Sequence, residues 1–141
     1  MITLGLFEKI ANDGVAGLVR NKSLFWEEMP LQSNGAPASG AWIVTRSGDN
    51  TTSHGRYNNK TTVDFFVAFG NKIKTETTHQ AILKWLIDNQ CICSLVGEID
   101  GNTYEFANVR IRPTSTPNND GVTENGLIVK SASAEIIYDL T

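Results

Sequence analysis

The two histidines and two cysteines are the first residues of this 141-residue chain to consider for chemistry. Cys91 and Cys93 stand two positions apart, which on a strand puts both thiols on one face but strains a bridge between them. With His54 or His79 they could bind a metal ion, but zinc sites use paired cysteine motifs at wider spacing, and a second pair is missing. We therefore expect no metal and no cofactor. The cysteines should instead be small apolar residues packed under a helix in a reducing compartment.

No catalytic constellation emerges from the remaining polar residues. Neither histidine stands near a serine or cysteine in the context of a nucleophile elbow, and no glycine-rich phosphate cradle follows a strand. Glu27 and Glu28 are adjacent, so on a strand they would point to opposite faces and could not share a proton. The sequence thus predicts no catalytic residue, and we do not expect an enzyme.

The charges are few and unevenly distributed. Twelve basic and fifteen acidic residues give a net charge of -3, which argues against a simple nucleic-acid-binding protein. Residues 46–74 carry five basic and two acidic side chains, whereas residues 97–141 carry three basic and seven acidic ones. Either this is a chance split of surface charge, or oppositely charged regions let copies stack head to tail. Basic loop residues could also line a channel for DNA, since electrostatic steering needs no base-reading groups.

Membrane and secretory classes are not favoured. No apolar run reaches the ~18 residues of a membrane-spanning helix, and the longest candidate, residues 81–93, is broken by Lys84 and Asp88. The first ten residues have no basic segment ahead of an apolar core. We expect a protein of the cytosol, or of a particle assembled there.

Hydrophobic periodicity predicts an α+β fold in one domain, residues 1–141. The clearest strand covers 61–69, where Val63 and Phe65 alternate with Asp64 and Phe66. Polar stretches at 47–59 and 114–126 should be long loops or a hairpin tip. The expected helices cover 2–18 and 75–89, and the expected strands or short extended runs cover 23–30, 41–46, 61–69, 91–96, 104–112 and 127–140.

These elements should form a mostly antiparallel sheet of about four to five strands, with two main helices packed on one face. Thr75 or Thr77 is the expected N-cap of the second helix. Leu83 and Ile87 should widen its buried stripe. The phase of the apolar residues shifts between Phe106 and Val109, which predicts a β-bulge.

Several of these segments together match a known pattern. Residues 109–117 read VRIRPTSTP, an Asn/Asp/Gly-rich loop follows, and the last strand ends in Ile136-Ile137-Tyr138. The segment WEEMP at 26–30 precedes them, as does the 63–69 strand with its following helix. In element order the chain resembles the tail-terminator and minor-capsid (tail-completion) proteins of long-tailed bacteriophages.

The resemblance implies a virion protein that is assembled in the host cytoplasm. It also implies a homo-oligomeric ring, which we expect to be a hexamer. Such a ring caps the tail tube, ends tube polymerisation and offers a surface to head-completion proteins. Its partners would be the tail tube protein and a head-completion protein, with non-specific passage of DNA and no membrane. The candidate interface or channel-lining residues are Arg46, His54, Arg56, Tyr57, Lys60, Phe66 and Ile137.

Two alternatives remain open at this point. One is a head-completion or stopper connector, which belongs to the same structural class. The other is a carbohydrate- or host-surface-binding module that would present Trp42, Tyr57 and the polar loops. The sequence assigns no role to the loops at 32–40 and 46–60.

Overall fold

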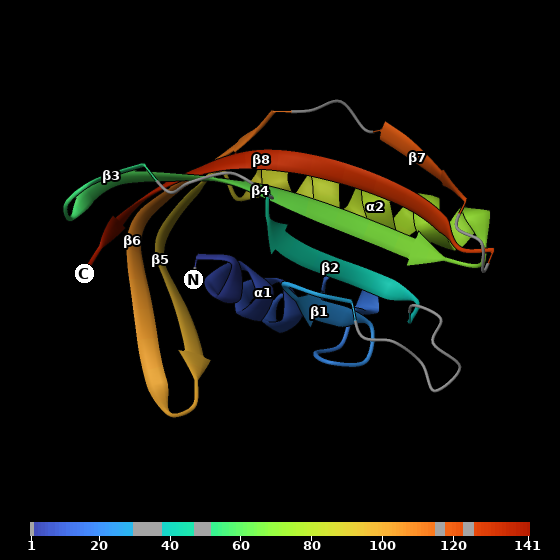
Figure 1. The fold of residues 1–141 in the computed structure, drawn as a ribbon, viewed down its shortest axis with the longest axis horizontal. Coiled ribbons are helices and arrows are strands. Elements are labelled where there is room, and N and C mark those ends of the chain that lie inside the picture. The colour runs from blue at the N-terminus through green and yellow to red at the C-terminus, as the bar shows by residue number, and fades with distance from the viewer. Residues whose placement is uncertain (1, 30–37, 47–51, 115–117, 123–125) are drawn as a thin grey trace.

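Two helices lie on one side of a curled, mostly antiparallel sheet (Figure 1). The computed structural model describes residues 2–29, 38–46, 52–114, 118–122 and 126–141, with the backbone alone at 52–54 and 118–121. Most of the 32–40 loop and the first part of the 46–60 loop therefore lie outside the described residues. The elements are α1 (Ile2–Asn12), a 3-10 helix η1 (Val15–Gly17), β1 (Leu24–Trp26), β2 (Gly40–Thr45), β3 (Thr52–His54), β4 (Tyr57–Phe69), α2 (Lys72–Asp88), β5 (Cys91–Ile99), β6 (Asn102–Pro113), β7 (Asn118–Val122) and β8 (Ile128–Leu140).

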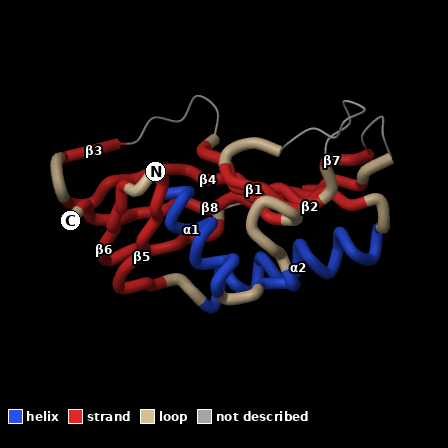
Figure 2. The backbone as a smooth tube through the Cα atoms, turned by 90° about the horizontal axis from the view of Figure 1, so that it is seen from below, coloured by secondary structure: helices blue, strands red, loops and turns tan. Residues whose placement is uncertain are grey.

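The sheet follows the order β1-β2-β4-β8-β6-β5, with β3 paired to β4 and β7 paired to β8. The pairing of β1 with β2 is parallel, and the other pairings are antiparallel. The predicted α+β class, with both helices on one face, is confirmed (Figure 2). The path has six strands, and β3 and β7 add short pieces beside it, so the expected number of strands was too low.

Strand β4 shows why the sheet has one buried face. Its Val63, Phe65 and Val67 are at most 1% exposed, whereas Asp64 and Phe66 between them point the other way. We call the side of β2, β4, β8 and β6 turned away from the helices the outer face. Residues Trp42, Val44, Lys60, Asp64, Phe66, Arg112, Ser133, Glu135 and Ile137 belong to it by strand alternation and cross-strand register.

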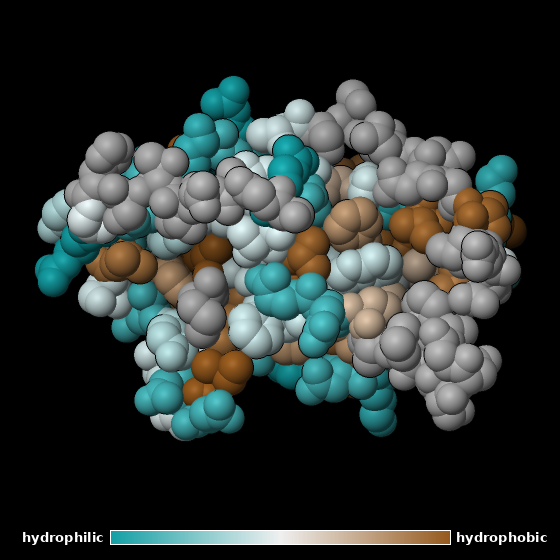
Figure 3. Space-filling model, viewed as in Figure 1, coloured by the Kyte–Doolittle hydropathy of each residue, from teal (hydrophilic) through white to brown (hydrophobic). Residues whose placement is uncertain are grey.

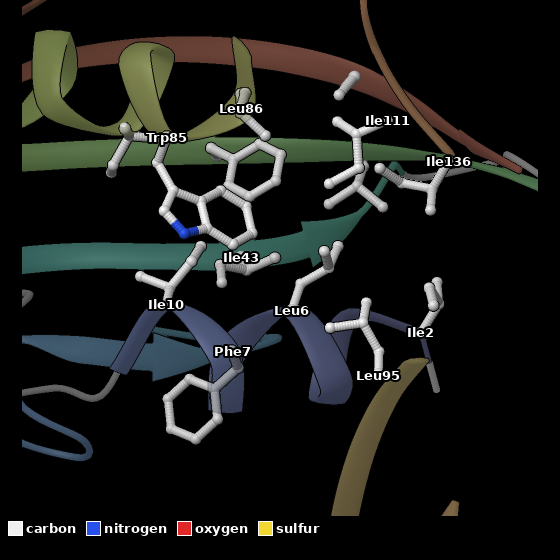
Figure 4. Close-up of a cluster of buried hydrophobic side chains, with 14 of the residues drawn as sticks. Ile2, Leu6, Phe7, Ile10, Ile43, Trp85, Leu86, Leu95, Ile111 and Ile136 are labelled. Carbon is white, nitrogen blue, oxygen red and sulfur yellow. The ribbon is translucent and has the colours of Figure 1, made fainter. Parts of the chain in front are cut away.

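The helices fill the other side of the sheet. Leu6 and Ile10 of α1 meet Trp85 and Leu86 of α2 in one buried cluster (Figure 4). Ile43, Leu95, Ile111 and Ile136 reach the same cluster from β2, β5, β6 and β8. Among the described residues, no helix has the length and apolar character needed to cross a bilayer.

Helix α1 approaches β5 very closely at Gly97. A Cβ added to Gly97 would lie 2.7 Å from the Leu4 Cγ and 3.2 Å from the Gly5 nitrogen. A Cβ on Gly5 would in turn lie 3.2 Å from the Leu95 Cβ. The two glycines therefore set the distance between helix and strand.

Both helix boundaries differ from those predicted. The first helix ends at Asn12 instead of continuing to 18, because Gly14 and Ala16 adopt positive φ angles of 66° and 52°. The second begins at Lys72, and its N-cap is Asn71, whose side chain accepts from the Ile73 and Lys74 nitrogens at 2.8 and 3.1 Å. Thr75 lies inside the helix, where its hydroxyl donates to the Asn71 carbonyl at 3.0 Å.

Three further expectations were wrong, and two were confirmed. Ile87 is 60% exposed, so it does not widen the buried stripe of α2. Glu27 lies beyond the end of β1 with a φ of 67°, and its carboxylate accepts from the Thr3 hydroxyl at 2.6 Å, so Glu27 and Glu28 do not alternate along a strand. The stretch at 114–126 is not a simple loop, because it contains β7. The stretch at 47–59 contains β3 and the turn into β4, which confirms the predicted hairpin tip there. The bulge is present: the register of β6 with β8 shifts after Ala107, and Asn108 has a φ of 51°.

Candidate functional site

A hydrogen-bonded triad joins three strands on the outer face. The Arg46 guanidinium, just after β2, donates from Nη2 to Asp64 Oδ1 at 2.9 Å and from Nε to Oδ2 at 3.3 Å. The same Nη2 donates to the Ser133 hydroxyl at 2.8 Å, and that hydroxyl donates to Asp64. Bidentate pairing of this kind fixes both side chains. Arg46 thus serves to connect β2, β4 and β8, and its charge is offset by Asp64.

Ion pairs and apolar side chains alternate along the rest of the outer face. Lys60 Nζ lies 3.0 Å from Glu135 Oε2, and Ile137 is half-buried in register with Lys60. The Phe66 ring stacks on Trp42 with centroids 5.1 Å apart and an interplanar angle of 18°. The Phe66 ring thus covers one face of the Trp42 indole. Figure 3 shows that hydrophobic atoms reach the surface in this view as separate patches among hydrophilic residues.

The β3–β4 turn forms a second candidate surface, which we call the hairpin tip (residues 54–57). Gly55 turns the chain with a φ of 89°, and Arg56 and Tyr57 are exposed. The Leu140 nitrogen donates to the Arg56 carbonyl at 2.7 Å. The Asn59 amide donates to the carbonyls of both Gly55 and Arg56 at 3.3 Å. The backbone of the tip is therefore held against the end of β8, while its side chains point into solvent.

Asp139 anchors the tip to the bulge in β6. One carboxylate oxygen accepts from the Asn108 side chain and the other from the Asn58 nitrogen, both at 2.9 Å. Both asparagines adopt positive φ angles, which Asn tolerates better than most residues. The Asn108 amide, followed by the Asn58 backbone and the charge of Arg110, holds the pKa of Asp139 below its ordinary value.

The candidate residues from the sequence thus fall into two groups. Arg46, Lys60, Phe66 and Ile137 lie on or beside the outer face. Arg56 and Tyr57 lie at the hairpin tip with His54, whose backbone pairs with Tyr57 and whose side chain is outside the described residues. In the described part of the chain, the Arg56 guanidinium has no hydrogen-bond or ion-pair partner, in contrast to Arg46 and Lys60.

The expectation for the cysteines was wrong. Cys91 and Cys93 are exposed on β5, the outermost strand, and line a hollow of about 240 Å³ with Asn108 and Arg110. His79 is 1% exposed on α2, and its Nε2 lies 3.0 Å from the Ser131 carbonyl. His79 is therefore bonded to β8 instead of pairing with the thiols. Within the described ranges, no three His, Cys, Asp or Glu residues gather as metal ligands would.

The sequence did not predict a third surface, a hollow of about 450 Å³ between α1, β1 and the end of β5. We call it the acidic groove. Leu4, Phe7, Phe25 and Trp26 form its apolar floor, and Glu28 and Glu98 lie at its rim. Glu28 and Glu98 are far apart in the chain, and the packing of α1 against β5 places both of them on this one hollow. The spacing of apolar residues in α1 predicts a buried helix face, but it does not predict a groove beside that helix.

No family model matches the chain, and no curated protein matches it significantly. The function must therefore be argued from the three surfaces described above.

Proposed function

We propose that the protein is a ring-forming connector of a long-tailed bacteriophage, which caps the tail tube, ends its polymerisation and joins the tail to head-completion proteins. The observation that carries the proposal is the arrangement of its surfaces. Both helices pack on one side of the sheet, which leaves the outer face, the hairpin tip and the acidic groove available to different partners. A terminator needs such unlike surfaces, since it binds the tube on one side and must not offer a second tube-like end on the other.

The outer face suits contact with a neighbouring protein. Half-buried Phe66 and Ile137 supply apolar area, and the surrounding charges Arg46, Lys60, Asp64 and Glu135 already pair with one another. A partner that covers these four side chains buries no unpaired charge among them, which would be costly. Arg112 on the same face has no ion-pair partner among the described residues, so a partner covering it would need to supply one.

A tube-capping assay tests the proposal. The tail tube protein of the same phage is polymerised with and without this protein, and tube lengths are measured by electron microscopy. We expect near-stoichiometric protein to stop growth and to appear as a ring at tube ends. Unchanged tube lengths with no end density would refute the proposal, and binding to DNA-filled heads alone would favour a stopper protein.

Two matched variants test whether the outer face is the surface needed for tube capping. Phe66→Ser removes an aromatic ring from the outer face, and Ile87→Ser changes a 60% exposed residue of α2. If the outer face meets the tube or the next subunit, Phe66→Ser lowers capping and Ile87→Ser does not. Circular dichroism confirms that both variants are folded.

A further inference from the structure

The acidic groove is built to receive a cation with an apolar body. Leu4, Phe7 and Phe25 are at most 6% exposed, so the floor is preformed, and Trp26 is half-buried beside them. Glu28 and Glu98 are exposed at the rim, and neither carboxylate has a hydrogen-bond or ion-pair partner among the described residues. A third lining carboxylate, Glu8, pairs with Arg20 at 2.8 Å. The groove therefore retains a net negative charge over an aromatic floor, a combination that favours arginine or lysine.

The hairpin tip offers the complementary chemistry. Tyr57 is 62% exposed, and the adjacent Arg56 side chain has no partner in the described ranges. Tyrosine and arginine are, with tryptophan, enriched among the residues that contribute most of the binding energy at protein interfaces. The backbone hydrogen bonds from Leu140 and Asn59 hold the tip in place, which lowers the entropy lost on binding.

Tip and groove lie on different parts of the molecule. Figure 1 places the tip at one end of the sheet beside β3, away from α1 and β1, so the tip does not fill the groove of its own chain. A contact between two unlike surfaces of identical copies is heterologous, and it closes into a ring when the rotation between copies allows. This is the head-to-tail contact that a ring subunit requires.

We infer that the hairpin tip of one copy docks in the acidic groove of the next, with Arg56 pairing with Glu28 and Glu98 and the Tyr57 ring covering the apolar floor. The inference rests on the ring of the proposed function and names the contact that builds it. Arginine matches carboxylates with paired hydrogen bonds, so the contact is specific as well as attractive. Salt should weaken it.

Charge reversal tests the contact. Arg56→Glu and Glu98→Arg are made singly and together, and the dissociation constant for self-association is measured by sedimentation at low salt. Each single change should weaken association by about tenfold or more, because it sets like charges against each other. The double variant restores opposite charges and should recover most of the affinity. Lys72→Glu is the control: it changes the net charge as Arg56→Glu does, at the exposed first residue of α2, and should leave association unchanged.

Three results would overturn the inference: single variants that associate like the wild type, a double variant no better than the singles, or a wild type that stays monomeric at high concentration. Thermal melts check that each variant is folded. The tube-capping assay separates this inference from the proposed function. If the wild type caps tubes but the charge-reversal variants associate normally, the proposed function stands and the proposed contact is refuted. If the double variant restores association but the wild type does not cap tubes, the proposed contact stands and the proposed function is refuted.

Discussion

Trp85 is the side chain through which α2 is fixed to both the core and the N-terminal segment. Its ring lies in the buried cluster with 6% exposure, and its Nε1 donates to Asp13 Oδ2 at 2.8 Å. The bond satisfies the one polar atom of a large apolar side chain. It also fixes the turn after α1 against α2.

Replacing Trp85 should therefore be costly. We expect Trp85→Ala to lower the free energy of unfolding by about 3–5 kcal/mol, through lost burial and the cavity left behind. Trp85→Phe keeps much of the ring and loses the bond to Asp13, so its cost should be clearly smaller. Urea denaturation measures both, and a near-neutral Trp85→Ala would contradict the placement of α2.

Asp139 gives the protein a predictable response to acid. Hydrogen bonds from Asn108 and Asn58 lower its pKa below the ordinary 3.8. The stabilisation from these bonds is thus fully present above pH 3.8 and is lost as the pH falls through the lower pKa of the folded state. Asp139→Asn should be less stable than the wild type at neutral pH, and the difference should shrink towards zero in strong acid.

Denaturant titrations at several pH values between neutral and about 2 measure this difference. Asn108→Gly removes the main donor, keeps the carboxylate and adopts the positive φ of residue 108, so it should reproduce part of the neutral-pH loss. A stability gap between wild type and Asp139→Asn that does not change with pH would contradict the assignment.

At the scale of elements, the start of α2 depends on one side chain. Asn71 accepts from two backbone nitrogens that have no partner within the helix. Asn71→Ala should lower the free energy of unfolding by about 0.5–2 kcal/mol, whereas Asn71→Asp should retain most of the stability, since aspartate caps equally well. Thermal or urea denaturation of the two variants decides the point, and an equal loss from both would argue against capping.

The packing of α1 on β5 depends on the absence of a side chain at residue 97. Gly97→Ala should cost about 1–3 kcal/mol, because its Cβ would lie 2.7 Å from Leu4 Cγ and force the helix away. Gly70→Ala is the matched control, since a Cβ there meets nothing within 4 Å. Unfolding experiments should show a loss for the first variant only.

The elements differ in how well their sequences predicted them. The alternation of Val63 and Phe65 with Asp64 and Phe66 was sufficient to predict most of β4, because one face of that strand is buried. Strands β3 and β7 lie in stretches rich in Asn, Thr, Ser and Gly that carry no such alternation. They pair because β4 and β8 offer them an edge, which is a tertiary effect that local patterns do not reveal.

For the molecule as a whole, surfaces that form only through tertiary packing could not be predicted from local sequence patterns. Arg56 and Tyr57 were predicted as candidates because they stand in a polar hairpin. The acidic groove was not predicted, because Glu28 and Glu98 come to line one hollow only when α1 packs between β1 and β5. Exposure of Cys91 and Cys93 was missed for a related reason: β5 lies at the edge of the sheet, where an apolar residue need not be covered.

The position of β8 determines when this fold can form. Its residues lie between β4 and β6, with pairs such as Asn59 with Tyr138 and Ile111 with Ile136. A ribosome therefore completes β4 and β6 before it has made the strand that joins them. Until β8 has been made, one edge of β4 and one edge of β6 have no partner strand. The sheet must then close by long-range pairing, which is slow. Many chains made at once would therefore expose these unpaired strand edges to one another before β8 closes the sheet.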